Sequence, residues 1–339
     1  MNWLLSLASL FASATALTCL SDTGNPTDTW LIMKEPHSTS YLYADPGQSL
    51  QPSIHSSLNS SSFGALTLTT ELMWIADSYV IYNDENPVNA TYSYAYGHTK
   101  GYFFYNDDTT GVWIQHSIPQ FPVGPTFTDD YQGLTHNAWT NAQQIFCMTL
   151  NTATLNTVAE SMLLSRPRVN DWKLSVAGSR LGSIFSLATG IYSEQPVCNS
   201  AEIQTRGGVQ LTVFAKSAQW THDIWDDCIT AAVNDSLYVQ SWLQGTPLGA
   251  FCPSSGQTVK DIQSVAFGFG TGSSWDHSVD HSKWGVAVSG SVLCLGDLNR
   301  VTSQATRGGG AVCTDLAGYV TSFLRSVAST DNCSNELEV

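Results

Sequence analysis

The chain has 339 residues, which suffices for one large domain or for two halves of roughly 150 residues each. Only 12% of the residues are charged, about half the usual share, and this suits a secreted or lumenal protein better than a cytosolic one. The net charge of −15 argues against a nucleic-acid ligand at pH 7, but the argument weakens in an acidic compartment, where the eight histidines gain protons and some carboxylates become neutral.

The first 16 residues, Met1 to Ala16, predict a signal peptide. They hold no charged side chain, are rich in Leu, Ala and Phe, and end in the small-x-small sequence Ala14-Thr15-Ala16. The apolar run is too short for a membrane anchor, and no later stretch has the required length.

Eight cysteines follow, and an even number behind a signal peptide favours disulfides over metal thiolates. Four N-glycosylation sequons fit the same compartment, at Asn59, Asn89, Asn234 and Asn332.

Residue patterns along the chain predict a mixture of strands and helices. Short β-branched or aromatic segments predict strands, and apolar residues at helical spacing predict helices. In chain order we expect a surface loop over Ser53–Ser62, strands over Ala65–Thr70, Leu72–Ile81 and Val209–Lys216, and helices over Ile224–Val233 and Leu316–Val327. The mixture indicates an α/β or α+β protein.

Two His-x-Lys tripeptides, His98-Thr99-Lys100 and His281-Ser282-Lys283, lie 183 residues apart. In a strand, residues i and i+2 point to the same face, so each tripeptide can place an imidazole beside an ammonium. Lysine is scarce, and two of the six lysines lie in these tripeptides. A single His-x-Lys occurs often by chance, so the weight rests on the second copy and its surroundings.

Each tripeptide is followed by a predicted hairpin. The strand, turn and strand are Gly101–Tyr105, Asn106–Gly111 and Val112–His116 in the first copy, and Trp284–Val288, Ser289–Gly290 and Ser291–Leu295 in the second. Fifteen residues separate Lys100 from His116, and fifteen separate Lys283 from Asn299. We interpret the agreement as a duplication, with an N-terminal half over residues 17–170 and a C-terminal half over residues 171–339.

A pair of histidines suits phosphodiester cleavage without a metal ion. One imidazole attacks phosphorus and forms a phosphohistidine, while the other protonates the leaving oxygen and later deprotonates water. Lys100 and Lys283, helped by His116 and Asn299, would neutralise the phosphoryl oxygens. One histidine must be neutral while the other is protonated, which favours a pH optimum near or below the usual histidine pKa.

Two other patterns have alternative interpretations. Asp276-His277 and Asp280-His281 would form one face of a helix and could bind zinc, or Asp280 could instead orient His281. Arg307 with the glycines 308–310 could form an anion-binding nest, although a glycine-rich turn is the commoner explanation.

With these residues in hand, the chain resembles the deoxyribonuclease II family, acid nucleases of the phospholipase D-like superfamily. The matching blocks follow the family's order: Gly97–Gly101, His116–Pro122, Asp280–Trp284, Gly296–Arg300 and Arg307–Gly310. The resemblance implies an α/β fold of two similar mixed-sheet half-domains, a pseudo-dimer that shares one active site at its interface. It also implies a lysosomal or secreted protein.

The resemblance further implies endonucleolytic cleavage of DNA at acid pH, without divalent metal or another cofactor, to 3′-phosphate and 5′-hydroxyl ends. His98, Lys100, His281 and Lys283 would be catalytic, with His98 as nucleophile and His281 as acid, and His116 and Asn299 would support them. It implies the disulfides Cys19–Cys147, Cys252–Cys333 and Cys294–Cys313, which leaves Cys198–Cys228 as a possible fourth. The superfamily has an Asp five residues after each Lys, where this chain has Tyr105 and Val288, so an orienting carboxylate must come from elsewhere or be absent.

Two other functions remain open. The protein could be a phosphodiesterase acting on lipid headgroups, or a secreted binding protein that keeps the fold without catalysis. No long apolar or amphipathic interfacial segment supports the first, and the intact residues of both tripeptides argue against the second.

Overall fold

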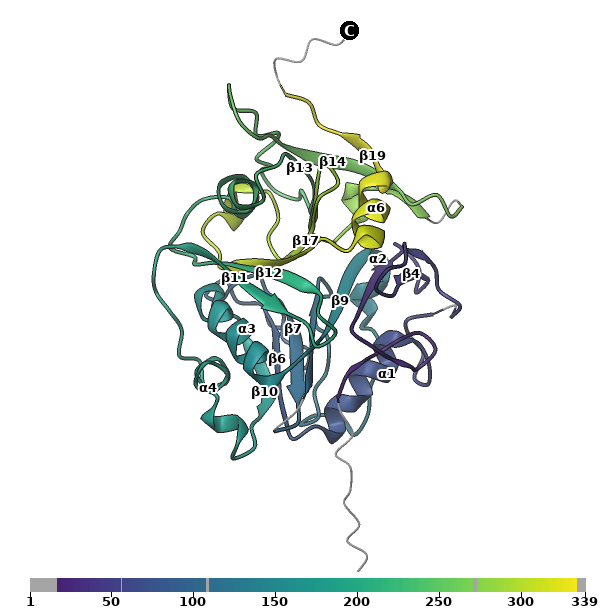
Figure 1. The fold of residues 1–339 in the computed structure, drawn as a ribbon, viewed down its shortest axis with the longest axis vertical. Helices are drawn as coiled ribbons and strands as arrows, with labels where there is room; N and C mark the ends of the chain where they lie inside the picture. Colours follow the sequence, from purple (N-terminus) through teal and green to yellow (C-terminus); the bar gives the residue numbers. More distant parts are fainter. Residues whose placement is uncertain (1–16, 56, 108–109, 271–272, 334–339) are drawn as a thin grey trace, which may run out of the picture.

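The structure is a computed structural model that describes residues 17–55, 57–107, 110–270 and 273–333. The signal peptide predicted over residues 1–16 lies outside the described residues. Two large sheets of eight and nine strands dominate a mixed α/β fold. The first sheet comes from the N-terminal part of the chain and lies in the lower part of Figure 1, and the second lies above it.

The first sheet has the strand order β10-β6-β7-β8-β9-β3-β4-β5, and all its neighbouring strands are antiparallel. Its strands are β3 (Thr29–Lys34), β4 (Tyr41–Ala44), β5 (Gln51–Pro52), β6 (Ser78–Asn83), β7 (Lys100–Tyr105), β8 (Gly111–His116), β9 (Gln143–Leu150) and β10 (Val169–Lys173). The helices of this part are α1 (Ala65–Glu71), α2 (His136–Thr140), α3 (Thr152–Ser165) and α4 (Gly182–Ala188), and β1 (Cys19–Leu20) pairs with β2 (Pro26–Thr27).

The second sheet has the order β11-β12-β18-β17-β16-β13-β14-β15, and β19 pairs with β14. Its strands are β11 (Cys198–Gln204), β12 (Gln210–Lys216), β13 (Leu237–Gln240), β14 (Val259–Ala266), β15 (Ser274–Asp276), β16 (Trp284–Ala287), β17 (Leu293–Gly296), β18 (Gly309–Thr314) and β19 (Val327–Thr330). A π-helical turn (Trp225–Ile229) leads into α5 (Thr230–Val233), and α6 (Ala317–Ser326) follows β18. Only β13 and β14 pair in parallel among these strands.

Five strands of each sheet occur in the same spatial order. They are β6-β7-β8-β9-β3 in the first sheet and β13-β16-β17-β18-β12 in the second. The order along the chain also agrees, and a helix follows the last strand in each case, α3 after β9 and α6 after β18. The boundary predicted at residues 170/171 falls inside β10, which pairs with β6, so the first sheet extends to Lys173.

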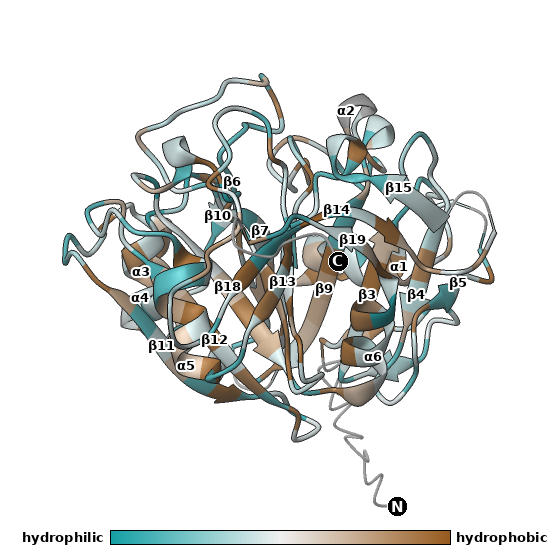
Figure 2. Cartoon of the chain, turned by 90° about the horizontal axis from the view of Figure 1, so that it is seen from above, coloured by the Kyte–Doolittle hydropathy of each residue, from teal (hydrophilic) through white to brown (hydrophobic). Residues whose placement is uncertain are grey.

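A continuous apolar core fills the space between the sheets, where α3 and α6 pack. In β7, Phe103 and Tyr105 face this core, whereas Tyr102 and Phe104 face the opposite side, which α1 covers. This alternation follows from the two-residue period of a strand. The outer face of the second sheet packs against Trp225 and its helical turn. In Figure 2 the strands and helices carry most of the apolar residues, and the outer loops are more hydrophilic.

Most of the predicted elements are confirmed. Both hairpins form, as β7–β8 and β16–β17, and the strand predicted over Val209–Lys216 is β12. The helices predicted over Ile224–Val233 and Leu316–Val327 are the π-helical turn with α5, and α6. The segment Leu72–Ile81 is part 3₁₀-helix, over Leu72–Ile75, and part strand, in β6. The described residues of Ser53–Ser62 lie outside helices and strands.

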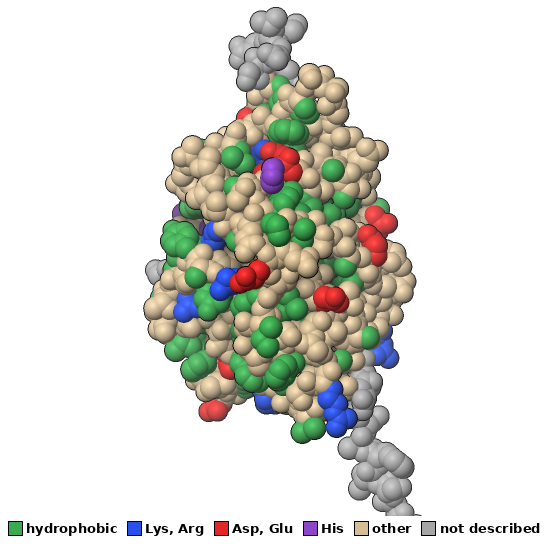
Figure 3. All heavy atoms as spheres, turned by 90° about the vertical axis from the view of Figure 1, so that its left-hand side faces the viewer, with side chains coloured by type: hydrophobic (Ala, Val, Ile, Leu, Met, Phe, Trp, Pro, Cys, Tyr) green, Lys and Arg blue, Asp and Glu red, His purple; other side chains and the backbone are tan. Residues whose placement is uncertain are grey.

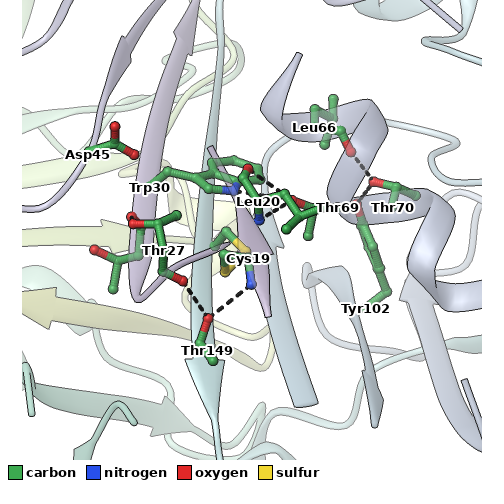
Figure 4. Close-up of a disulfide and its surroundings, with 12 residues drawn as sticks. Cys19, Leu20, Thr27, Trp30, Asp45, Leu66, Thr69, Thr70, Tyr102 and Thr149 are labelled. Carbon is green, nitrogen blue, oxygen red and sulfur yellow. Dashed lines mark hydrogen bonds between the residues drawn. A yellow bond between two sulfur atoms is a disulfide. The ribbon is translucent and has the colours of Figure 1, made fainter. Parts of the chain in front are cut away.

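The strand predicted over Ala65–Thr70 is wrong, because this segment forms α1. The hydroxyl groups of its threonines form hydrogen bonds that are compatible with a helix. Thr70 Oγ1 donates to the carbonyl of Leu66 at 2.6 Å, and Thr69 Oγ1 accepts from the backbone N–H of Leu20 at 2.9 Å. Figure 4 shows these contacts beside the Cys19–Cys147 disulfide. Tertiary contacts therefore override the β-propensity of the threonines.

All eight cysteines are paired, as Cys19–Cys147, Cys198–Cys228, Cys252–Cys333 and Cys294–Cys313. These are the pairings that the family resemblance implies, including the fourth. The sequon residues Asn59, Asn89, Asn234 and Asn332 are all exposed. Within the described ranges, no helix has both the length and the apolar character needed to cross a membrane.

The packing of Gly285 against Trp225 gives a test of this core. A Cβ atom at position 285 would lie 2.8 Å from the fully buried Trp225 ring, which has no room to move away. We expect Gly285→Ala to lower the free energy of unfolding by about 1–3 kcal/mol, measured by denaturant unfolding. Gly182→Ala in α4 is the matched control, because a Cβ there meets no atom within 4 Å. Equal stability of the two variants would contradict this account of the core.

Candidate active site

Both His-x-Lys tripeptides lead into equivalent strands. Lys100 is the first residue of β7, and Lys283 directly precedes β16. The lysines are 2% and 1% exposed, so their ammonium groups lie inside the protein. A small pocket is lined by residues from both sheets or their ends: His98, Lys100, His116, Ser117, Lys283, Gly296 and Asp297.

The backbones of the two tripeptides are held in the same way, each by the other part of the chain. The N–H of His98 donates to the carbonyl of Gly308 at 2.8 Å, and the N–H of His281 donates to the carbonyl of Ala142 at 2.9 Å. Gly308 directly precedes β18, and Ala142 directly precedes β9. The two acceptors therefore occupy equivalent places in the two sheets.

The imidazole rings repeat this pattern. Nδ1 of His98 contacts the carbonyl of Asp297 at 2.7 Å, and Nδ1 of His281 contacts the carbonyl of Ser117 at 3.1 Å. Asp297 directly follows β17, and Ser117 directly follows β8. A carbonyl oxygen can only accept, so both Nδ1 atoms must carry a proton and both neutral rings keep the lone pair on Nε2.

A buried carboxylate lies between the cations of the site. Asp84 directly follows β6, and its side chain contacts Lys100 Nζ, Arg307 Nη2 at 3.0 Å and His98 Nε2 at 3.8 Å. Burial alone would raise the pKa of Asp84, but the charges of Lys100 and Arg307 outweigh this effect and lower it. Asp84 thus pairs with Lys100 and Arg307, while the His98 ring is held by the Asp297 carbonyl.

Burial and positive charge favour the neutral form of both imidazoles in the free protein. Burial, with the charges of Lys100, Arg307 and Lys283, lowers the pKa of His98 well below its usual value. Burial, with the charges of Lys283 and Lys100, does the same to the pKa of His281. The site is therefore prepared to accept an anion.

Two further groups of the site titrate near neutral pH. Burial, with the charge of Lys100, lowers the pKa of Lys283 to about 7, and burial raises the pKa of Asp297 to about 7. As pH rises through about 7, Lys283 loses a positive charge and Asp297 gains a negative one. Acid therefore makes the site more positive by up to two charges, one from each group.

His116 and Asn299 lie in different environments despite their equal spacing from the lysines. His116 lines the pocket, and its Nδ1 accepts from the N–H of Ile118 at 3.1 Å, so Nε2 carries the proton. Burial, with the charge of Lys100, lowers the pKa of His116 to about 3, so this ring can donate a hydrogen bond but not supply charge. Nε2 has no protein partner within the described part of the chain.

Asn299 is not among the residues that line this pocket. Its Oδ1 accepts from the N–H of Trp242 at 3.2 Å, and the Trp242 ring packs 5.3 Å from the His281 ring. The turns of the two hairpins differ in length, so the residue that ends β17 as His116 ends β8 is Gly296. Equal spacing in sequence therefore does not give Asn299 the place of His116.

The structure corrects the expected role of Asp280. Its carboxylate accepts from Trp275 Nε1 at 2.8 Å and from the N–H of Ser282 at 2.9 Å, while the Ser117 carbonyl holds the His281 ring. Asp280 thus fixes the backbone of the second tripeptide rather than the imidazole.

The zinc interpretation of the neighbouring residues has no geometric support. Asp276 ends β15 and accepts from the N–H of Ser278 at 2.9 Å, while Asp280 and His281 make the separate contacts given above. Among the residues that the structure describes, no three His, Cys, Asp or Glu side chains gather closely enough to hold a metal ion.

The residues of Arg307–Gly310 do not form an anion nest. They pack closely against the segment that contains Gly97 and His98. The Arg307 side chain reaches Asp84, and the Gly308 carbonyl binds His98. A Cβ atom at Gly308 would lie 2.2 Å from the carbonyl oxygen of Ser165, and one at Gly97 would lie 2.0 Å from the same atom. Only glycine permits this close approach at both positions.

Each sheet also has a buried lysine at an equivalent strand end. Lys34 ends β3, and its Nζ donates to the carbonyl of Trp139 at 3.1 Å, four residues before β9. Lys216 ends β12, and its Nζ donates to the carbonyl of Ala305 at 2.7 Å, four residues before β18. Burial lowers the pKa of Lys34 to about 7 and that of Lys216 to about 8. Each ammonium thus holds the segment that leads to Ala142 or to Gly308.

Comparison with known proteins identifies the family of the chain. The sequence profile of the family "Deoxyribonuclease II" matches residues 18–333 of the chain. Deoxyribonuclease-2-alpha of Mus musculus is 30% identical over 97% of this chain and 97% of its own length. Deoxyribonuclease-2-alpha of Rattus norvegicus is 28% identical over 97% and 98%, and plancitoxin-1 of Acanthaster planci is 26% identical over 96% and 95%. The chain therefore belongs to the deoxyribonuclease II family and is a nuclease of that family.

Proposed function

We propose that this protein is an acid endodeoxyribonuclease that hydrolyses DNA without a divalent metal, through a phosphohistidine. The observation that carries the proposal is the pair of buried histidines, each held at Nδ1 by a backbone carbonyl, so that each neutral ring has its lone pair on Nε2. The names of the relatives, which are deoxyribonucleases, support DNA as the substrate.

The reaction has two balanced steps. In the first, Nε2 of His98 forms a bond to phosphorus while the bond to the 5′-oxygen breaks, and His281 gives its Nε2 proton to that oxygen. In the second, His281 takes a proton from water, whose oxygen bonds to phosphorus and releases His98. The products are a 5′-hydroxyl and a 3′-phosphate.

Local charges support these roles. Asp84, 3.8 Å from His98 Nε2, counters the positive charge that develops on the ring when it bonds to phosphorus. The His281 ring instead contacts the carbonyl of Ser117. A bound phosphodiester would raise the pKa of His281 by offsetting the charges of the nearby lysines. Lys100 and Lys283 then stabilise the phosphoryl oxygens, and His116 donates a hydrogen bond from Nε2.

We further propose that the chain is a duplicated pair of half-domains with one active site between them. The common order of five strands, the reciprocal carbonyls on the two histidines and the matched lysines at β3 and β12 support this. Asn299 is retained as a supporting residue that acts through Trp242 and His281. The four disulfides are consistent with a lysosomal or secreted protein, in which the exposed sequons would carry glycans.

The central test is cleavage of plasmid DNA at about pH 5, with and without EDTA. We expect cleavage that EDTA does not inhibit, and products that carry a 3′-phosphate. His98→Ala and His281→Ala should each lower kcat by roughly 10²–10⁴-fold or more, because each removes one reacting imidazole. The matched control is His222→Ala, since this side chain is 59% exposed, and its contacts with Asp227 and Trp220 lie outside the pocket. Loss of activity in EDTA would overturn the metal-free mechanism.

The pH dependence should follow Lys283 and Asp297. Activity should fall as pH rises through about 7, because Lys283 loses its proton and Asp297 becomes negative. Asp297→Asn removes one negative charge above pH 7 and keeps the backbone carbonyl that holds His98. We expect the alkaline limb of the kcat/KM profile to move up by roughly half to one pH unit.

The exposed Asp227 supplies a control for this profile, because Asp227→Asn changes charge by the same amount outside the site. A limb that shifts equally in both variants would mean that general electrostatics, and not Asp297, sets the alkaline limit.

A further inference from the structure

Two tyrosine rings lie exposed at the edge of the candidate site. They belong to the segment that connects β6 to β7, where Tyr94 is 75% exposed and Tyr92 is 39% exposed. Their ring centroids are 4.5 Å apart at an interplanar angle of 85°, an edge-to-face arrangement. The guanidinium carbon of Arg307 lies 5.2 Å from the Tyr92 centroid and 5.5 Å from the Tyr94 centroid. The rings are therefore held in place before any ligand binds.

A short series of contacts joins these rings to the reacting groups. Arg307, which is 2% exposed, donates to the hydroxyl of Tyr92 and to Asp84. Asp84 in turn pairs with Lys100 and lies 3.8 Å from His98 Nε2. The segment that carries the tyrosines also continues directly into Gly97 and His98. A group bound on Tyr94 would thus flank a phosphate bound at His98.

Because the protein is acidic, a contact with a base could contribute binding energy that its surface charges do not supply. Six of the 13 basic side chains are buried: Lys34, Lys100, Lys216, Lys283, Arg300 and Arg307. Figure 3 shows that charged side chains are sparse and scattered on one face of the molecule. With a net charge of −15, the surface cannot gain much binding energy from counterion release along a DNA backbone. Base stacking on aromatic rings does not depend on that charge.

We propose that Tyr94, supported by Tyr92 and Arg307, is a stacking surface for a nucleobase next to the cleaved phosphodiester. The inference rests on the proposed nuclease function and adds a base-binding subsite to it. The subsite would be tolerant of sequence, since every base offers a flat π face. Trp242 does not provide an equivalent surface, because it is half-buried and packs on the His281 ring.

The test compares the full-length protein with its Tyr94→Ala and Tyr94→Phe variants on a single-stranded oligodeoxynucleotide at about pH 5. Tyr94→Ala should raise KM by roughly five- to a hundredfold and leave kcat within about twofold, the range expected for loss of one stacked base. Tyr94→Phe should behave like the unaltered protein, because it keeps the ring. The dependence of KM on salt should be unchanged in both, since no phosphate contact is removed.

A second substrate separates stacking from a structural effect. An oligonucleotide of the same length whose bases are replaced by abasic sites should be a poorer substrate for the unaltered protein, whereas Tyr94→Ala should no longer distinguish the two substrates. Phe185→Ala is the control, because Phe185 is 41% exposed but lies on α4, outside the site. If Tyr94→Ala cleaves DNA with an unchanged KM, the subsite is overturned while the nuclease proposal stands. If the unaltered protein cleaves no DNA, the nuclease proposal itself fails.

Discussion

The geometry of the site depends on the close approach of two chain segments at Gly97 and Gly308. Both glycines pack against the carbonyl of Ser165, at distances that leave no space for a Cβ atom. This close approach lets the Gly308 carbonyl reach the backbone of His98, and a similar contact joins His281 to Ala142. Each of the two histidines is therefore positioned by backbone from the opposite sheet, and backbone atoms in a packed core hold such geometry more rigidly than mobile side chains. Separating the sheets would dismantle both histidine environments together.

The same packing explains how an acidic protein can bind a polyanion. The chain has few cations, and it places three of them, Lys100, Lys283 and Arg307, in one buried region with Asp84. In a region of low dielectric constant, a few charges act more strongly than many charges on a solvated surface. Burial also brings the pKa values of Lys283 and Asp297 to about 7, so acid adds positive charge at the proposed phosphate site. The proposed acid preference would thus have a source in the packing as well as in the histidines.

The sequence predicted the parts of the site that consist of side chains in recognisable patterns. The tripeptides and hairpins follow from spacing, and the family resemblance supplied the disulfides. Asp84 lacked any such pattern, because it approaches Lys100 only through the pairing of β6 with β7. The carbonyls of Ser117 and Asp297 could not be predicted either, since every residue type provides a backbone carbonyl. Adjacency offered Asp280 as a possible partner of the His281 ring, but its carboxylate accepts from Trp275 and Ser282.

The buried lysines give the proposed duplication an argument that does not use the tripeptides. Lys34 and Lys216 end equivalent strands, and each binds a carbonyl four residues before the next strand of its sheet. A desolvated ammonium carries an energetic cost in each half, as their lowered pKa values indicate. Two independent origins for the same costly arrangement are harder to explain than one ancestral half-domain, in which that lysine already held the segment leading to the opposite histidine.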